Sequence, residues 1–600
     1  MIAFRDDLQI LRGLAVTFVF LYHLKVHGFE NGYLGVDLFF VLSGFLMALL
    51  TEKDNVLEFY NRRLRRLLPA YLATIFITSI IIAFVSIPSD ANQSFNKFWF
   101  NIIGLSNIAF WFENTYFESE SFKPFLHLWS LGVEMQFYLV APFLLPFLRH
   151  KLVLTLLLVI GSLVISILFT SISPKTSFFM MPLRLWEFLV GALVAWYPLR
   201  LSSKLNQGWA ETVGLAMLLG VIFLYPLKHE SHNILYGHPG LAAFLVVTIT
   251  AFLIAFKMDN EFVIKGFLGR IMSRLGDYSY SIYLIHFPII ILFNYQGFEG
   301  TRLGYEGITN AFIIILLTFI LSFLMFNFVE SLRSSKKFLK IIFIAFSGLI
   351  FLGLTLPSIN NWRFSDKQLR IFNAWEDRSS YRCGKIFQLL NPTEGICPLG
   401  IQDGKYKILL LGNSHADSIK TSFAGSMDKN GVSSYFYVDN NPLMSKQASA
   451  KFIASDIARL NIEKVVIHYS LGFYEEESYQ NELINFINLM NDQQVDVIFI
   501  SPTPSYKFHV PKLLYEQSIN ESVQLKKQTM AEYFKNNNSF YSLIKKLNIL
   551  DRNIFYSQQF LCPENDCLIS INGNPVYFDA SHLTITGANL LIPIFNQIAD

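Results

Sequence analysis

Three side chains with the chemistry of a serine hydrolase occur in two short motifs near the end of the sequence. Ser414 lies in the segment GNSHA, directly after the apolar run YKILLLG at 406–412. Asp579 and His582 lie three residues apart in the segment DASHLTITGA. An aspartate can orient an imidazole, and the imidazole can take the proton of a serine hydroxyl, so these residues could form a nucleophilic triad. The alternative is that Ser414 only caps the helix that follows the turn.

A second candidate pair, Arg12 and His23, lies in the apolar segment LRGLAVTFVFLYH. Eleven positions on an α-helix turn through roughly 1100°, which places both side chains on one face, ~16 Å apart along the axis. A charged side chain within a bilayer costs at least ~2.5–3.5 kcal/mol and usually faces the interior of a bundle. The pair therefore predicts a polar groove along this helix. The alternative is that Arg12 reaches the membrane surface and His23 is a buried structural histidine.

Further ionisable residues occur in other apolar segments of the first half of the chain. They are Asp37, His127, Glu134, Arg184, Glu187 and His286. His127 and Glu134 are seven residues apart and so share one helix face, and Arg184 can pair with Glu187 at i, i+3. Each would be costly against lipid, so we expect these side chains to converge with Arg12 and His23. A purely structural network of buried pairs is the alternative.

These side chains require membrane-spanning helices to position them. Hydrophobic residues make up 52% of the 600 residues and charged residues only 16%, against about 25% charged in soluble proteins. Eleven apolar runs are each long enough to cross a hydrocarbon core of ~30 Å. The predicted spans are about 8–25, 33–51, 70–88, 127–148, 152–171, 180–198, 210–227, 240–257, 278–295, 308–329 and 339–357. The shorter stretch 97–112 is predicted to be re-entrant or interfacial, and a twelfth span there would move the C-terminus to the other side.

The lysine and arginine positions orient these spans. With a cytoplasmic N-terminus, the cytoplasmic connections carry 17 Lys and Arg residues and the opposite connections carry six. This asymmetry agrees with the positive-inside rule and places the chain after residue 358 outside the cytoplasm. All four cysteines of the sequence lie in that exported part, where disulfides form.

The four cysteines allow three disulfide connectivities. We expect the local pairing, Cys383 with Cys397 and Cys562 with Cys567. A zinc site is the alternative, but the spacing is not that of paired C-x2-C ligands, and no metal is predicted.

The exported part alternates strand-like and helix-like segments. Short apolar runs at 406–412, 464–470 and 495–501 are separated by helical patterns. Such alternation predicts a parallel sheet covered by helices. Ser414 would then lie at the carboxyl edge of the sheet, where ligands bind in open α/β sheets. The sequence contains no basic tract or aromatic–basic pattern that indicates nucleic acid.

The first half of the chain resembles the acyltransferase-3 family of membrane acyltransferases. The resemblance rests, in chain order, on Arg12-x10-His23 and the segments GYLGVDLFFVLSGF, RRLRRLLPAY, HLWSLGVEMQFYL, RLWEFLVGAL and YSYSIYLIHFPI. It implies transfer of an acyl group, usually acetyl, from cytoplasmic acyl-CoA towards an acceptor outside the cytoplasm. In that family the Arg-x10-His pair of the first helix is regarded as essential for acyl transfer. The resemblance therefore assigns this essential role to Arg12 and His23, and supporting roles to Glu134 and Arg184.

The chemistry of these residues is compatible with that role. Histidine can act as a general base or a transient acyl acceptor, and arginine can hold a phosphate or a carbonyl oxygen. A cytoplasmic arginine cluster could contact the phosphates of coenzyme A or could serve only to fix the membrane orientation. Its members are Arg62, Arg63, Arg65 and Arg66.

The two C-terminal motifs resemble the SGNH hydrolase superfamily, including the domains often fused behind acyltransferase-3 regions. Such a domain usually opens with Gly-Asp-Ser-His and closes with D-x-x-H-L-S-x-x-G-A. This chain has Asn413 in place of the aspartate and Thr584 in place of the serine. The Gly and Gly-x-Asn-Asp blocks of the oxyanion hole have no clear match, and VVIHYSLGFY occupies the region where one could lie. The expected oxyanion donors are the backbone N–H of Ser414 and the adjacent Asn413.

The apolar runs, the strand and helix patterns and the two resemblances together predict a polytopic helical bundle of about eleven transmembrane helices, followed by an α/β/α SGNH domain of flavodoxin-like topology. The expected parts are a membrane acyltransferase domain at 1–337, a last transmembrane helix at 338–357, a periplasmic extension at 358–404 and the SGNH-like domain at 405–600.

The implied function is O-acetylation in the bacterial inner membrane, with a cytoplasmic N-terminus and a periplasmic C-terminal domain. The donor substrate would be acetyl-CoA, with no permanently bound cofactor, and the acceptor a hydroxyl of a surface glycan such as lipopolysaccharide O-antigen or core. In one alternative the SGNH-like domain is an esterase that removes acetyl groups. In another, the protein is a glycan transporter with a periplasmic binding domain.

Overall fold

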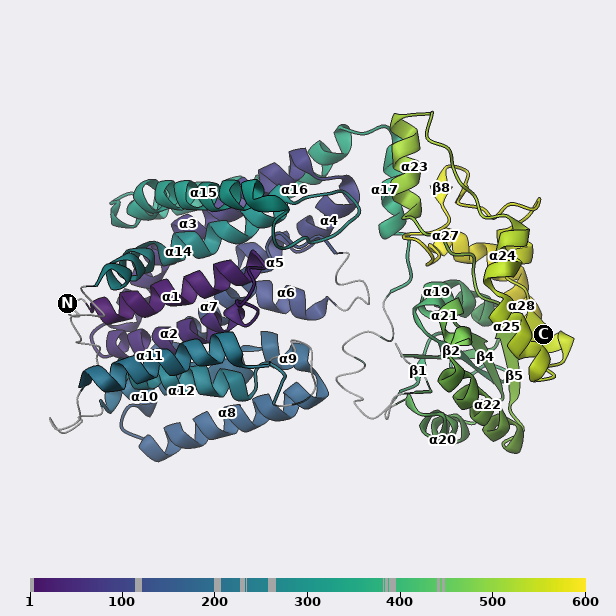
Figure 1. The fold of residues 1–600 in the computed structure, drawn as a ribbon, viewed down its shortest axis with the longest axis horizontal. Helices are drawn as coiled ribbons and strands as arrows, with labels where there is room; N and C mark the ends of the chain where they lie inside the picture. The colour runs from purple at the N-terminus through teal and green to yellow at the C-terminus, as the bar shows by residue number, and fades with distance from the viewer. Residues whose placement is uncertain are drawn as a thin grey trace. The chain divides into compact units, whose positions relative to one another are not determined.

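A computed structural model describes the chain at residues 5–113, 121–198, 207–226, 233, 235–256, 266–380, 383, 387, 395–439, 443–444 and 448–600. The chain divides into two compact units, with the main boundary between Ile359 and Asn360. The N-terminal unit is a helix bundle, and the C-terminal unit contains a β-sheet flanked by helices (Figure 1). Two predicted basic connections, at 200–204 and in the first part of 257–274, lie outside the described residues.

Each of the eleven predicted spans coincides with a helix. These helices are α1 Asp6–His23, α2 Gly35–Thr51, α3 Val56–Val85, α7 Leu128–Leu148, α8 Leu152–Ile172, α10 Met181–Trp196, α11 Gln207–Leu224, α12 Leu241–Phe256, α14 Phe267–Phe293, α15 Gly307–Leu324 and α16 Phe338–Trp362. Seven of the described helices are long and apolar enough to cross a membrane. Others are shorter: α10 and α12 have 16 residues each, or about 24 Å. The unit is therefore a membrane bundle with seven or more spans, and the number eleven stays a prediction.

Helix α3 extends further towards the N-terminus than the predicted span. It begins at Val56 and runs for 30 residues, with the side chain of Asn55 accepting a hydrogen bond from the Glu58 N–H at its start. The basic segment that was expected to connect two spans is therefore largely helical. Leucine and arginine are both strong helix formers, so the apolar helix continues through this charged segment.

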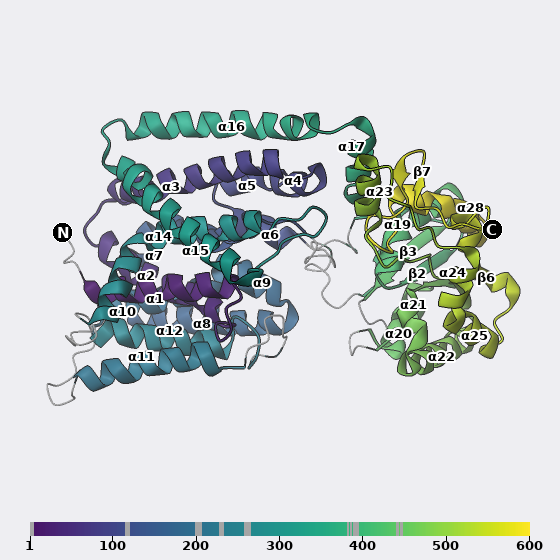
Figure 2. The ribbon, with the colours of Figure 1, turned by 45° about the horizontal axis from the view of Figure 1, so that its top comes forward.

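The stretch 97–112 forms two short helices, α5 Phe98–Ile102 and α6 Ser106–Phe112. Each is too short to cross a hydrocarbon core, in agreement with a re-entrant or interfacial segment. Helix α16 packs beside this region and α3 (Figure 2), and a Cβ on Gly353 would lie 2.5 Å from the Phe98 ring.

Helix α1, which carries Arg12 and His23, crosses α14 at very short range. A Cβ on Gly13 would lie 2.0 Å from the carbonyl oxygen of Met272, and a Cβ on Gly276 would lie 2.0 Å from that of Gln9. Only glycine permits this approach, because small residues let two helix backbones come together. The reciprocal contact fixes the register of α1 against α14.

The C-terminal unit contains a six-stranded sheet in the order β1-β3-β2-β4-β5-β6. The strands are β1 Cys397–Pro398, β2 Lys407–Gly412, β3 Ser433–Val438, β4 Lys464–His468, β5 Asp496–Ile500 and β6 Ile554–Phe555. Strands β2 to β6 pair in parallel, while β1 is antiparallel to β3. The sheet is therefore mixed, and the prediction of parallel pairing is correct for its central strands.

Helices cover both faces of this sheet. On one face α19 Ser414–Lys429 and α28 Ile592–Ala599 pack against inward-pointing residues of β2, β3 and β4. On the other face lie α20 Ala450–Leu460, α22 Glu477–Asp492 and α25 Asn538–Lys546. Three strands were not predicted: β1 and β6 have two residues each, and β3 begins with two serines, so none shows a clear apolar run.

Both disulfides have the expected local connectivity. Cys383 bonds to Cys397, and Cys562 bonds to Cys567. Within the described parts of the chain, no group of three or more His, Cys, Asp or Glu side chains is arranged to hold a metal ion. The extension before the sheet includes a further helix, α17 Asp366–Phe372, which belongs to the C-terminal unit.

Candidate active sites

Ser414, His582 and Asp579 lie together at the carboxyl end of the sheet. Ser414 is the first residue of α19 and follows β2 through a tight turn, in which a Cβ on Gly412 would lie 2.0 Å from the His468 carbonyl oxygen. His582 Nε2 lies 2.8 Å from Ser414 Oγ, and His582 Nδ1 lies 2.7 Å from Asp579 Oδ2. The three side chains form a continuous hydrogen-bonded chain, an arrangement that can remove the serine proton.

The carboxylate of Asp579 is held by its own loop. Its Oδ1 accepts the backbone N–H groups of Ser581 and His582, each at 2.8 Å. Burial acts to raise the pKa of Asp579, but the neighbouring His582 and these two N–H groups outweigh it and lower the pKa to about 2. The carboxylate is therefore ionised at neutral pH and can stabilise an imidazolium on His582.

Two side chains that the sequence did not single out surround His582. The His415 ring lies 4.5 Å from the His582 ring, and His415 Nδ1 lies 3.1 Å from Thr503 Oγ1. Burial, followed by the neighbouring His582, lowers the pKa of His415 well below its usual value, so this second imidazole stays neutral. The ring of Phe578 stacks on that of His582, with 5.6 Å between the ring centres. His415 lies within the GNSHA motif, which was the only signal that could have drawn attention to it.

The side chain of Asn413 bridges two strands of the sheet. Its Oδ1 accepts the N–H groups of His415 at 3.1 Å and Ser470 at 3.3 Å, and its Nδ2 donates to Ser470 Oγ at 2.7 Å. Most of its hydrogen-bonding capacity is therefore used within the protein, although the sequence had suggested it as an oxyanion donor. The N–H of Ser414 is at the first position of α19, where an N–H has no acceptor within the helix.

In the helix bundle, the eight ionisable side chains expected to share one site form three groups. The first contains His23, His127 and His286, the second Arg12 and Glu134, and the third Asp37, Arg184 and Glu187. The expectation of a single convergent site is therefore corrected. Arg12 and His23 share a helix face but lie three turns apart, so each contacts different side chains at a different position along α1.

The histidine group contains a direct imidazole–imidazole contact. His23 Nδ1 lies 3.0 Å from His286 Nε2, and His286 Nδ1 lies 3.0 Å from the backbone oxygen of Ile282. A carbonyl oxygen only accepts, so in the neutral ring His286 Nδ1 carries the proton and Nε2 accepts from His23 Nδ1–H. This assignment leaves the lone pair of a neutral His23 on Nε2, as a nucleophile or base requires.

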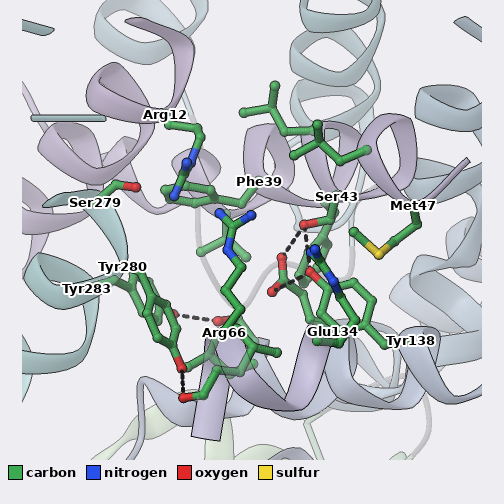
Figure 3. Close-up of a pocket in the computed structure, with 18 residues that line it drawn as sticks. Arg12, Phe39, Ser43, Met47, Arg66, Glu134, Tyr138, Ser279, Tyr280 and Tyr283 are labelled. Atoms are coloured by element: carbon green, nitrogen blue, oxygen red, sulfur yellow. Dashed lines mark hydrogen bonds between the residues drawn. The ribbon is translucent and has the colours of Figure 1, made fainter. Parts of the chain in front are cut away.

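The arginine group lines a cavity of about 80 Å³. Figure 3 shows the guanidinium groups of Arg12 and Arg66 directed towards each other, with Glu134, Ser43 and Tyr138 beside them. Glu134 Oε1 accepts from Ser43 Oγ at 2.6 Å, and Glu134 Oε2 accepts from the Tyr138 hydroxyl at 3.2 Å. The cavity therefore combines positive charge with a fixed carboxylate.

The predicted coenzyme A contacts divide into two pairs. Arg63 and Arg66 line this cavity. Arg62 Nη2 lies 3.2 Å from Asp54 Oδ1, and Arg65 donates to two backbone carbonyls in the segment before α16. A helix presents only one face to a cavity, so the four arginines could not all point into it.

Two hydroxyl groups connect the cavity to the histidine group. Tyr283 and Ser130 both line the cavity, and their side-chain oxygens lie 2.5 Å apart. The Tyr283 hydroxyl donates to the backbone oxygen of His127 at 2.8 Å, and the His127 ring lies 5.9 Å from that of His286. Polar groups thus extend from the arginine end of α1 towards its histidine end.

The third group is a fully buried ion cluster between α2 and α10. Arg184 Nη2 lies 2.8 Å from Asp37 Oδ1, and Arg184 Nε lies 2.6 Å from Glu187 Oε1. His238 Nε2, a partner that the sequence did not reveal, lies 3.1 Å from Asp37 Oδ2. The cluster forms where the two backbones meet closely, since a Cβ on Gly44 would lie 1.9 Å from a carbonyl oxygen of α10. These contacts join α2 and α10 through charged side chains.

The chain belongs to the acyltransferase-3 family, because the family model described as "Acyltransferase domain" matches residues 5–327. A second model, described as "SGNH domain (fused to AT3 domains)", matches residues 382–597. The helix bundle is thus the acyltransferase domain and the sheet-containing unit is the SGNH domain.

Two similar proteins are named O-acetyltransferases. O-acetyltransferase OatA of Staphylococcus aureus (strain NCTC 8325 / PS 47) is 30% identical over 354 residues, which are 55% of this chain and 57% of that protein. The match thus covers less than two thirds of OatA. A protein of S. aureus (strain MRSA252), provisionally named O-acetyltransferase SAR0937, is 28% identical over 484 residues, which are 72% of this chain and 77% of that protein.

One solved structure is also similar to the C-terminal part. The periplasmic domain of a lipopolysaccharide acetyltransferase from Salmonella ser. Paratyphi A is 19% identical, with a TM-score of 0.30. The similarity covers 39% of this chain and 98% of that domain.

Proposed function

We propose that the protein is an O-acetyltransferase that carries an acetyl group from acetyl-CoA at the cytoplasmic side of the membrane to a hydroxyl of a cell-surface glycan. The observation that carries this proposal is the presence of two histidine-centred sites in one chain, a His23–His286 pair in the helix bundle and a complete Ser–His–Asp arrangement in the SGNH unit. The names of the similar proteins support the choice of an acetyl group and an oxygen acceptor.

The donor would bind at the arginine cavity. Arg12, Arg63 and Arg66 all line it, and guanidinium groups suit the phosphates of coenzyme A because they make paired, charge-assisted hydrogen bonds. The Lys and Arg distribution supports a cytoplasmic position for this end of α1. Arg12 and His23 are ~16 Å apart along the helix. The extended pantetheine arm of coenzyme A can span this distance.

His23 would receive the acetyl group in the membrane. Its Nε2 attacks the thioester carbonyl carbon, the carbon–sulfur bond breaks, and coenzyme A leaves as the thiolate. His286 Nε2, which lies 3.0 Å from His23 Nδ1, takes the Nδ1 proton and leaves a neutral acyl-imidazole. In this scheme His286 is a positioning residue that also holds the proton.

Ser414 would then take the acetyl group and pass it to the glycan. His582 Nε2 removes the Ser414 proton while Ser414 Oγ attacks the acyl carbon. The bond from that carbon to the donor nitrogen breaks, and His582 gives the proton to the departing nitrogen, which leaves His582 neutral again. A sugar hydroxyl next attacks the acetyl-serine ester and gives its proton to His582, and Ser414 leaves with a proton from that imidazole. The product is an O-acetyl sugar and the free enzyme.

The acceptor class is a glycan outside the cytoplasm. Two disulfides in the SGNH unit support an oxidising compartment, which fits a periplasmic C-terminal unit of an inner-membrane protein. Lipopolysaccharide O-antigen or core is the acceptor that we propose within this class.

Membrane vesicles given labelled acetyl-CoA on their cytoplasmic side test the proposal. Wild-type vesicles should place label on surface glycan, identified by mass spectrometry, and His23→Ala and Ser414→Ala should each abolish it. Acetate release without a glycan product would identify an esterase instead. Unlabelled glycan with the wild-type protein would indicate a transporter.

A further inference from the structure

We infer that the hydroxyl of Ser470 is a hydrogen-bond donor of the oxyanion hole beside Ser414. The inference rests on the proposed function, because it concerns the acetyl-enzyme on Ser414. An acyl-transfer site needs donors for the negative charge that develops on the carbonyl oxygen, and the Ser414 N–H is one such group. The described geometry supplies a second donor in the turn that follows the neighbouring strand β4.

Ser470 is brought to the site by the pairing of β2 with β4. Gly412, the last residue of β2, pairs with His468, the last residue of β4. Both strands end at the same edge of the sheet, so the residues that follow them lie next to each other. Asn413 joins these two turns through three hydrogen bonds, to the N–H of His415 and to the N–H and Oγ of Ser470.

The hydrogen bonds of Asn413 determine the role of the Ser470 hydroxyl. Asn413 Oδ1 accepts two backbone N–H groups, so the amide orientation is fixed and Nδ2 must face Ser470 Oγ, 2.7 Å away. Ser470 Oγ therefore accepts this bond and keeps its own O–H to donate.

That O–H is not used elsewhere in the described structure. Ser470 precedes α21 Leu471–Glu475 at the N-cap position, but its side chain makes no capping hydrogen bond. Among the described residues, the bond from Asn413 is the only side-chain hydrogen bond of Ser470. The residue is partly exposed, in contrast to the buried strand residues before it. A donor that is oriented, polarised by an amide and partly exposed is what an oxyanion requires.

The same geometry explains why the residue before the nucleophile is Asn. An aspartate at 413 would accept a hydrogen bond from the Ser470 hydroxyl instead of donating one to its oxygen, and the O–H would no longer be available to the substrate. Asn413 is thus a positioning residue, and Ser470 is the residue that contacts the reacting oxygen. The proposed role of the Ser470 hydroxyl therefore requires an asparagine at position 413.

The test uses full-length protein in proteoliposomes, with acetyl-CoA and isolated surface glycan. Ser470→Ala should lower kcat on the order of 10²- to 10³-fold, as is usual for one oxyanion donor, with KM for the glycan unchanged within about twofold. Ser470→Thr keeps a hydroxyl and should retain most of the activity. Ser478→Ala, on the exposed surface of α22, is the matched control and should behave as wild type.

A double-mutant cycle separates the proposed role from a structural one. Asn413→Asp should lower kcat to a similar extent, and adding Ser470→Ala to it should cause little further loss, because both changes remove the same donor. A boronic acid that forms a tetrahedral adduct on Ser414 should bind more weakly to each variant in proportion to the loss of kcat.

The outcomes distinguish the inference from the proposed function. If Ser414→Ala leaves acetyl transfer intact, the proposed function fails and the inference fails with it. If Ser414→Ala abolishes transfer but Ser470→Ala changes kcat by less than about threefold, only the inference is overturned. It is also overturned if Ser470→Thr loses as much as Ser470→Ala, or if the loss appears in KM and in the melting temperature instead of in kcat.

Discussion

Both candidate centres contain a histidine whose Nδ1 contacts another side chain, and they differ in which side chain that is. In each, that histidine Nδ1 lies within hydrogen-bonding distance of the neighbouring side chain, so the lone pair of the neutral ring is on Nε2. In the SGNH unit the partner is the carboxylate of Asp579 at 2.7 Å, and in the helix bundle it is the imidazole of His286 at 3.0 Å.

The partners match the proton movements that each centre would have to support. His582 would have to accept a full proton from a hydroxyl, and a nearby anion stabilises the imidazolium that results. His23 would attack a thioester with its lone pair and need only lose its Nδ1 proton afterwards. A neutral imidazole can take that proton without placing a lone carboxylate in the membrane, where an unpaired charge is costly.

The centres also differ in how they are built. The triad is carried by turns at a sheet edge, fixed by short-range hydrogen bonds such as those of Asp579 with the N–H groups of its own loop. The membrane pair depends on the register of α1 and α14, which Gly13 and Gly276 set through backbone contact. Changes in a single side chain should therefore act locally in the first centre, and changes in helix packing should act on the second.

The largest expected effect is the loss of the nucleophile. Ser414→Ala should lower the rate of glycan acetylation by roughly 10⁶-fold, as for the loss of a triad serine in other enzymes. The measurement is label transferred from acetyl-CoA to glycan. If the SGNH unit merely binds glycan, the variant will retain substantial transfer and the comparison of two reactive centres is wrong.

The next effect concerns the carboxylate partner. Asp579→Asn should lower kcat by about 10⁴-fold, because an amide favours the wrong tautomer of the histidine. Steady-state kinetics with saturating glycan measure this change. A loss below about tenfold would mean that His582 is oriented by other contacts, such as its packing on Phe578.

The imidazole partner should matter less. His286→Leu should lower the acetylation rate by about 10²-fold, the scale of a misplaced reactive group. His286→Gln should recover part of this loss, because its amide oxygen can accept from His23 Nδ1–H. Equal activity of the two variants would contradict the assignment of tautomers in the membrane pair.

A smaller effect is expected on donor binding. Arg66→Ala should raise KM for acetyl-CoA by about tenfold, the equivalent of ~1.4 kcal/mol for one charge-assisted contact. Arg62→Ala is the control, since Arg62 faces solvent with 59% of its side chain exposed and pairs with Asp54. Equal effects on KM would indicate that general positive charge, and not the cavity, attracts the donor.

The smallest effect is on stability, and it depends on pH. The pKa of Asp579 falls from 3.8 to about 2 in the folded protein, which corresponds to about 2 kcal/mol of stabilisation. This contribution is present above pH ~4 and is lost as the pH falls through ~2. Asp579→Asn should therefore lower the melting temperature of the SGNH unit by roughly 4–8 °C at pH 7. At pH 2.5 most of this difference should be gone, and an undiminished difference would contradict the ionised carboxylate.

The sequence by itself determined the parts whose signal is local. A long apolar run in a membrane protein is expected to form a helix in the bilayer, and each of the eleven predicted runs coincides with a described helix. The central strands and the motifs around Ser414 and His582 were visible for the same reason, because strand, turn and residue spacing are encoded within a few neighbouring positions. The cysteines were paired correctly because the expected partners are close in the chain.

The tertiary structure alone decided which distant side chains meet. Periodicity places Arg12 and His23 on one face of α1, but it does not show that His286 and Glu134 join different ends of that face. Nor does it show that Arg184 takes both carboxylates into a separate buried cluster. Contacts between helices depend on their register, which here is set by glycines packed against carbonyl oxygens of another helix. The bond from Asn413 to Ser470 joins residues 57 apart, and only the side-by-side pairing of β2 and β4 brings them together.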